Sequence, residues 1–125
     1  MRKPDTGKMQ KEEFLKRTMN FGLRAIRLVN SLPKQEVAQV LGKQLLRAGT
    51  SVGANYRAAV RGKSRADFIA KMGIVEEECD EALYWMEMLI ESDLVQPALL
   101  KELRDEGNQI LSIVVASIKT ARRNK

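Results

Sequence analysis

Apolar residues recur along this chain at steps of three and four, the spacing that places side chains on one face of an α-helix. The most regular run consists of Phe68, Met72, Val75, Cys79, Ala82, Met86 and Leu89. Comparable stripes occupy residues 12–31, 34–61 and 97–121, and short segments connect them. The pattern therefore predicts an all-α fold, an antiparallel up-down-up-down four-helix bundle.

Residues that break or cap helices separate these stripes. Pro33 follows the first stripe and suits the opening turn of the next helix, as Pro97 does for the last. Gly62 suits a helix C-terminus, and Ser64 with Asp67 three residues later resembles an N-terminal capping pair. The expected organisation is a flexible basic lead-in at residues 1–11, a bundle domain at residues 12–121 and a basic tail at residues 122–125.

Glycines and uncharged polar residues interrupt the second stripe. Gly42, Gly49 and Gly53 each lower helix propensity by about 1 kcal/mol relative to alanine, which favours close helix approach at these positions. The polar residues on the neighbouring face are Gln44, Ser51 and Asn55. They could line a ligand pocket, but no acid, base or nucleophile pair accompanies them. We therefore interpret them as a hydrogen-bonded seam that sets the register of the helices.

Composition narrows the class of protein. The chain has 125 residues, of which 44% are hydrophobic and 30% charged, which fits one globular domain. Its longest nearly apolar run, residues 110–118, is too short to span a bilayer, and the N-terminus lacks the apolar stretch of a signal peptide. A single cysteine fits a reducing compartment. We expect a cytoplasmic protein with no membrane partner.

The chain contains no histidine, which excludes histidine-based catalytic triads and histidine-ligated zinc or di-iron sites. The acidic residues that could bind a metal are Glu78, Glu81, Glu102 and Asp105. Their two pairs resemble the carboxylates of magnesium-dependent all-α nucleotide pyrophosphatases, but at about 100° per residue both lie far from the apolar stripes. Cys79 lies within a stripe and is expected to be an inert core thiol. We predict no enzyme activity, cofactor or metal site, with the pyrophosphatase as a lesser alternative.

Charge is unevenly distributed along the chain. The total is +6, but residues 1–71 carry +11, residues 72–100 carry −8 and residues 101–125 carry +3. This segregation indicates either a polyanionic partner or attraction between chains, against the simpler alternative of solvated helix faces. The candidate phosphate contacts are Lys43, Arg47, Arg57, Arg61, Lys63 and Arg65. Without interleaved aromatic residues or a helix-turn-helix, binding to RNA or DNA would be nonspecific.

One side of the third predicted helix carries a second row, away from the apolar stripe: Ile74, Tyr84, Trp85 and Met88. An exposed apolar row that contains the single tryptophan is typical of a subunit interface. The wide apolar faces of the first and last predicted helices also favour self-association. We hypothesise a homo-oligomer with this row at its interface; the alternative is that Trp85 packs within its own subunit.

Several motifs resemble one protein family: Gln44-Leu45, Ser51-x-x-x-Asn55-Tyr56-Arg57, Ser64-x-x-x-Phe68, Lys71, Glu78 and Tyr84-Trp85. From about Phe14 to Ile118 the chain resembles the four-helix-bundle proteins whose founding members are encoded in intervening sequences of bacterial large-subunit ribosomal RNA genes. The family often has a glutamate after the Asn-Tyr-Arg triplet, where this chain has Ala58. The resemblance therefore transfers no role that depends on that carboxylate.

The resemblance implies a ring-like homopentamer from a bacterial cytoplasm and carries no established catalytic activity. In architecture the chain is also similar, more loosely, to accessory bundle proteins of diversity-generating retroelements, whose basic pentamers bind nucleic acid and a reverse transcriptase. The sequence therefore predicts a non-catalytic, self-assembling bundle whose basic surface binds RNA or DNA. The competing prediction is a protein-interaction scaffold that binds another protein and no nucleic acid.

Overall fold

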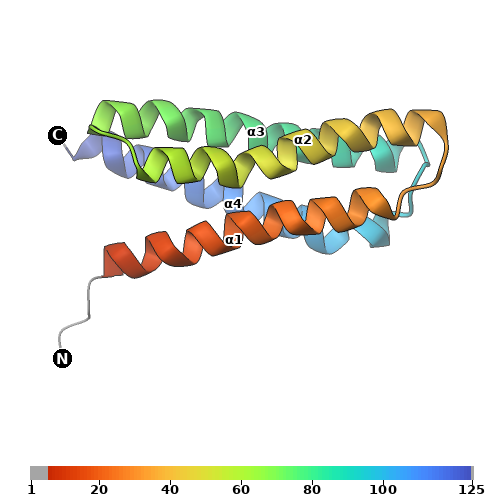
Figure 1. Ribbon diagram of the computed structural model, residues 1–125, viewed down its shortest axis with the longest axis horizontal. Coiled ribbons are helices and arrows are strands. Elements are labelled where there is room, and N and C mark those ends of the chain that lie inside the picture. The colour runs from red at the N-terminus through yellow and green to blue at the C-terminus, as the bar shows by residue number, and fades with distance from the viewer. Residues whose placement is uncertain (1–5, 125) are drawn as a thin grey trace.

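The computed structural model describes residues 6–124, with side chains from residue 10 onward, and in this part of the chain it contains four helices and no strand. The helices are α1 (Thr6–Asn30), α2 (Glu36–Val60), α3 (Arg65–Glu91) and α4 (Pro97–Arg123). They run alternately up and down the long axis of the molecule (Figure 1). The predicted all-α antiparallel bundle is confirmed. None of the described helices combines the length and apolar character needed to cross a membrane.

The first helix begins earlier than the apolar pattern indicated. It starts at Thr6, so residues 6–11 of the predicted lead-in are helical, while residues 1–5 lie outside the described part of the chain. Between residues 6 and 11, Gly7 is followed by the good helix formers Lys8, Met9, Gln10 and Lys11 and by no proline, so nothing in this segment stops the helix. At the other end, α4 includes Arg122 and Arg123 of the predicted basic tail.

One continuous hydrophobic core lies between the four helices. Its largest fully buried apolar side chains are Phe21, Leu45, Met72, Met86, Leu89, Leu100 and Ile110. The stripe at 68–89 is buried as predicted, except that Phe68 is half-buried. Thr18 is the one fully buried polar side chain of the described residues, and its hydroxyl donates a hydrogen bond to the carbonyl of Phe14 at 2.9 Å.

Helix α2 packs closely on α1 at the glycines that the sequence singled out. A Cβ atom on Gly49 would lie 2.9 Å from the Cβ of Ala25, and one on Gly53 would lie 3.2 Å from backbone atoms of Thr18. These contacts are with rigid atoms, which confirms that close helix approach is the reason for glycine here. By contrast, α1 and α4 make the least extensive of the four contacts between helices.

Substituting Gly49 by alanine should lower the free energy of unfolding by up to about 2 kcal/mol, because the overlap of the new methyl group with Ala25 costs about 1–3 kcal/mol and the better helix propensity returns about 1 kcal/mol. Urea unfolding followed by Trp85 fluorescence measures this change. Gly73→Ala is the matched control: no atom lies within 4 Å of its added Cβ. That variant should gain about 1 kcal/mol from helix propensity. Equal effects at the two positions would contradict the close-approach argument.

Candidate nucleic-acid interface and association surfaces

One end of the bundle brings together the C-terminal ends of α2 and α4 and the connection from α2 to α3 (Figure 1). We call this the basic end, because it carries seven exposed cations: Arg57, Arg61, Lys63, Arg65, Lys119, Arg122 and Arg123. Among the described residues, none of these seven forms an ion pair with a carboxylate. The antiparallel topology explains the cluster, since α2 and α4 both end here.

The connection between α2 and α3 is held tightly. Ser64 caps α3 by accepting a hydrogen bond from the backbone N–H of Asp67 at 3.0 Å, which confirms the predicted capping pair. The Asp67 carboxylate in turn accepts bonds from Lys71 Nζ at 2.7 Å and from the backbone N–H of Lys63 at 3.2 Å. These bonds, led by the one from Lys71, lower the pKa of Asp67. A Cβ on Gly62 would lie 2.9 Å from the backbone carbonyl oxygen of Ala59, which favours glycine in this turn.

Two of the predicted phosphate contacts do not belong to the basic end. Arg47 reaches across to α3, where it pairs with Glu78 at 3.1 Å and also with Glu81. The pairing holds Arg47 within its own subunit, whereas the sequence had offered it as a candidate phosphate contact. Lys43 is exposed, but it precedes Arg57 by fourteen residues, about 21 Å of helix at 1.5 Å per residue. The structure adds three cations from the end of α4 to this cluster: Lys119, Arg122 and Arg123. The sequence had not grouped them with the candidate phosphate contacts.

The polar seam forms local bonds. Ser51 donates its hydroxyl hydrogen to the carbonyl of Arg47 at 2.6 Å, and the Asn55 amide donates to the carbonyl of Ser51 at 2.9 Å. Both acceptors belong to α2 itself, and Gln44 is half-buried on the same helix. Within the described residues no hydrogen bond from this seam reaches another helix. The predicted role of the seam in setting helix register is therefore not supported by an interhelical hydrogen bond within one subunit.

The predicted interface row lies on the outer side of α3. Ile74, Tyr84 and Met88 are exposed, whereas Trp85 is half-buried against the core. The Trp85 indole N–H donates to Glu81 at 3.3 Å, and its ring meets that of Tyr84 edge-on at 5.0 Å. The alternative that Trp85 packs within its own subunit is therefore correct in part, while the residues around it remain uncovered.

Further apolar side chains are exposed on α1 and α2. Met19, Leu23 and Ile26 are exposed on α1, and Val40 is exposed on α2. The first three follow one another at steps of four and three and belong to the wide apolar face that the sequence predicted for the first helix. The exposure of Val40 could not be predicted from spacing, because it depends on which side of α2 packs against its neighbouring helices.

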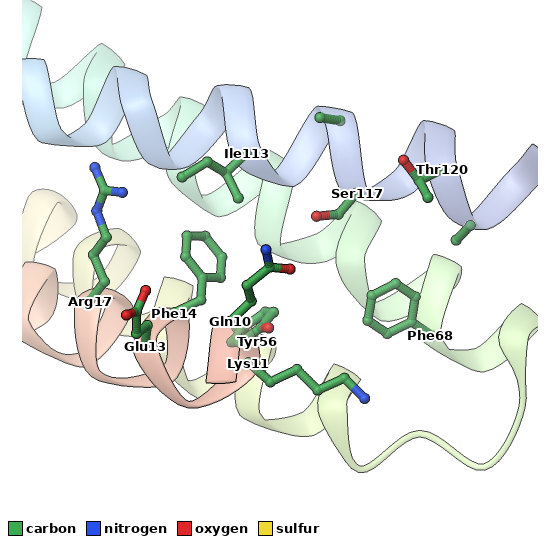
Figure 2. A pocket seen from close by; sticks show the side chains of 12 residues that line it. Gln10, Lys11, Glu13, Phe14, Arg17, Tyr56, Phe68, Ile113, Ser117 and Thr120 are labelled. Atoms are coloured by element: carbon green, nitrogen blue, oxygen red, sulfur yellow. The ribbon is translucent and has the colours of Figure 1, made fainter. Parts of the chain in front are cut away.

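A groove of about 670 Å³ opens between α1 and α4 at the basic end. Figure 2 shows Phe14, Tyr56, Phe68 and Ile113 around it. The rings of Phe14 and Tyr56 pack edge-on at 4.7 Å and are both buried, and this burial raises the pKa of the Tyr56 hydroxyl. On the rim, Arg17 is bound by Glu106 at 2.6 Å and by Gln109 at 2.6 Å. Of the three aromatic side chains that line the groove, Phe68 alone is half-buried and not buried.

The carboxylates of the pyrophosphatase hypothesis stay apart. Glu78 and Glu81 face Arg47 on α2, whereas on α4 Asp105 accepts a bond from Lys101 at 3.0 Å. The described residues contain no group of three or more histidine, cysteine or acidic side chains that could hold a metal. Cys79, the other candidate for chemistry, is fully buried, and its Sγ lies 3.3 Å from the carbonyl oxygen of Gly107.

Comparisons with known proteins agree on one family. The profile of the 23S rRNA-intervening sequence protein family matches residues 10–116, a span that includes parts of all four helices. The chain is also similar to the crystal structure of a protein of unknown function from the S23 ribosomal protein family of Bacteroides thetaiotaomicron VPI-5482. The identity is 32%, the TM-score is 0.81, and the match covers 87% of this chain and 97% of that one. No curated protein matches the sequence.

The buried thiol leads to a testable pH dependence. Burial, assisted by Asp80 and Glu106, raises the pKa of Cys79 from 9.0 to about 12. Below pH 9 the thiol is neutral in both states, but between pH 9 and 12 it ionises only when unfolded, so the free energy of unfolding should fall as pH rises. Its slope should exceed that of Cys79→Ala by up to about 1.4 kcal/mol per pH unit. Urea unfolding at several pH values measures both; identical slopes would contradict this account.

Proposed function

The chain belongs to the 23S rRNA-intervening sequence protein family, and from this premise we propose that it is a non-catalytic bundle that assembles with copies of itself and binds RNA or DNA through its basic end. The observation that carries the proposal is the cluster of seven exposed cations without a carboxylate partner among the described residues. The family name refers to 23S rRNA, so RNA is the first ligand to test.

Phosphate binding needs this arrangement and little more. Lysine and arginine side chains that neutralise phosphates release condensed counterions, which makes the affinity depend on salt and largely independent of sequence. The charges come from three separate segments, the end of α2, the connection with the start of α3, and the end of α4. The hydrogen bonds of the connection fix the backbone around Lys63 and Arg65. Binding therefore has to order only the side chains of these two residues.

Self-assembly would strengthen this attraction. Each basic end contributes a weak site, and linking several sites raises the overall affinity without any new contact. The exposed apolar side chains on the outer sides of α1, α2 and α3 supply surfaces on which copies could pack. A ring of five copies is what the family resemblance implies.

A protein-interaction scaffold is the competing function. The observation that favours it is the same exposed apolar surface, which would serve protein contacts whether or not nucleic acid binds. In that case the cations serve solubility and pairing between subunits. The non-catalytic part of the proposal has its own test, because magnesium-dependent nucleotide hydrolysis that disappears in Glu78→Gln would overturn it.

Neutralising three cations of the basic end, in the combined variant Arg61→Gln, Arg65→Gln and Arg122→Gln, should weaken RNA binding and its salt dependence. Each lost phosphate contact on a single strand lowers the slope of log K against log salt by about 0.7, so the slope should fall by about 2. Filter binding of a short unstructured RNA over a range of salt concentrations measures it.

Lys34→Gln is the control, because Lys34 is exposed in the connection at the opposite end of the bundle and forms no ion pair among the described residues. This variant should bind as the wild type does. A fall in slope of about 0.7 in Lys34→Gln, one third of the fall expected for the three substitutions, would show that net charge, and not the basic end, attracts the RNA. No retention of RNA by the wild type at low salt would leave the scaffold as the function.

A further inference from the structure

The groove between α1 and α4 is open because α4 presents small side chains to it. Ala116, Ser117 and Ala121 line the groove on this helix, where larger side chains would fill the space. Its volume of about 670 Å³ lies within the range of roughly 300–1,000 Å³ that is typical of ligand sites. The groove is therefore large enough for a flat group such as a single nucleobase.

Phe68 provides an aromatic surface at one side of this groove. It is half-buried, and Figure 2 shows its ring beside the opening, across from Phe14. The sequence assigned Phe68 to the buried stripe of the third helix, so it indicated no aromatic side chain among the candidate phosphate contacts. Proteins that bind single-stranded nucleic acid without sequence preference combine such rings with a positively charged surface.

The Tyr56 hydroxyl borders the same groove without a hydrogen-bond partner. The side chain is exposed to only 6%, and its hydroxyl forms no hydrogen bond with another described residue. Every fully buried side-chain oxygen or nitrogen of the described residues has a partner, so the Tyr56 oxygen belongs to the part of the residue that remains open. Ser117 and Thr120 add two hydroxyls from α4. A hydroxyl both donates and accepts, so it can bond to the edge of any base.

Two cations of the basic end lie next to the groove. Arg65 precedes Phe68 by three residues on α3, so it extends the same side of that helix. Arg123 follows Thr120 by three residues and extends the groove-lining side of α4. Both are exposed, and neither forms an ion pair among the described residues. The phosphates that flank a base in the groove would therefore meet positive side chains.

The charges of the groove lining itself cancel. Arg17 lines the groove but is bound by Glu106, and Lys11 is offset by Glu13, the one carboxylate of the lining. The surplus positive charge therefore lies beside the groove and not within it. This distribution matches a nucleotide, because its base is uncharged and its phosphates remain outside. A small carboxylate or a free phosphate would instead need an unpaired cation inside the groove.

We propose that the groove holds one unstacked base of a bound single strand of RNA or DNA, with the base stacked on Phe68 and the flanking phosphates at Arg65 and Arg123. The inference rests on the nucleic-acid binding proposed above and adds the form of the ligand. Bases within a duplex are already paired and stacked, so only a single strand can supply one. Every base has a π-face, so this contact keeps the binding largely independent of sequence.

The first test removes the ring and keeps the apolar bulk. Phe68→Leu should weaken the binding of oligouridylate at low salt by about fivefold or more, which is the effect of losing a base–aromatic stack. Phe68→Tyr is the matched control, because it retains a ring and should bind as the wild type does. Filter binding measures the affinities, and circular dichroism confirms that both variants are folded. Unchanged binding by Phe68→Leu, or equal losses in the two variants, overturns the inference.

A strand without bases provides the control on the ligand side. An abasic oligonucleotide of the same length carries the same phosphates but has nothing to stack. The wild type should bind it at least about fivefold more weakly than oligouridylate, and Phe68→Leu should not weaken this binding further. Equal wild-type affinities for the two strands contradict a base in the groove.

Cross-linking locates the base directly. An oligonucleotide that contains 5-iodouracil attaches to a nearby aromatic side chain on irradiation, and trypsin then cuts after Arg65 and Lys71. The cross-link should lie in the fragment of residues 66–71, which contains Phe68, and it should disappear in Phe68→Leu. A cross-link in any other fragment overturns the inference.

The wild type separates this inference from the proposal on which it rests. A wild-type protein that binds neither RNA nor DNA at low salt refutes nucleic-acid binding as a whole. Salt-dependent binding that is weakened by the combined variant of the basic end, but not by Phe68→Leu, refutes only the base in the groove.

Discussion

The packing of α2 between α1 and α3 is the constraint on which the rest of the molecule depends. Toward α1 the helix is so close that a methyl group on Gly49 would overlap Ala25 and one on Gly53 would crowd the backbone of Thr18. Toward α3 it makes the most extensive contact in the bundle, and Arg47 closes the outer edge of that contact on Glu78 and Glu81. The position of α2 therefore also determines which sides of α1 and α3 face outward.

This arrangement sorts the charges of the protein into two kinds. Arg17, Arg47 and Lys71 are bound by carboxylates in the same subunit and contribute to the cohesion of the bundle. The cations of the basic end have no such partner in the described chain and stay available to ligands. The acidic segment at residues 72–100 lies on α3 and the start of α4, and Arg47 of α2 pairs with two of its carboxylates, Glu78 and Glu81.

The same packing leaves apolar surface outside. A helix in a four-helix bundle needs one apolar stripe, yet α1 and α3 each have a second row that their neighbours do not cover. Large exposed apolar side chains at regular spacing are unfavourable in water unless another molecule covers them.

The amino-acid pattern by itself determined the four helices, the inward stripe at residues 68–89 and the cap at Ser64, because spacing, capping and glycine preferences act over a few residues. It also located Gly49 and Gly53 as close contacts and the outer row of α3. Only the tertiary structure decided that Arg47 is bound by Glu78 and Glu81, and that Arg122 joins Arg61 and Lys63 at one end of the bundle. These relations join residues from different helices. They depend on the topology of the bundle and on the register between helices, and the periodicity of a single helix specifies neither.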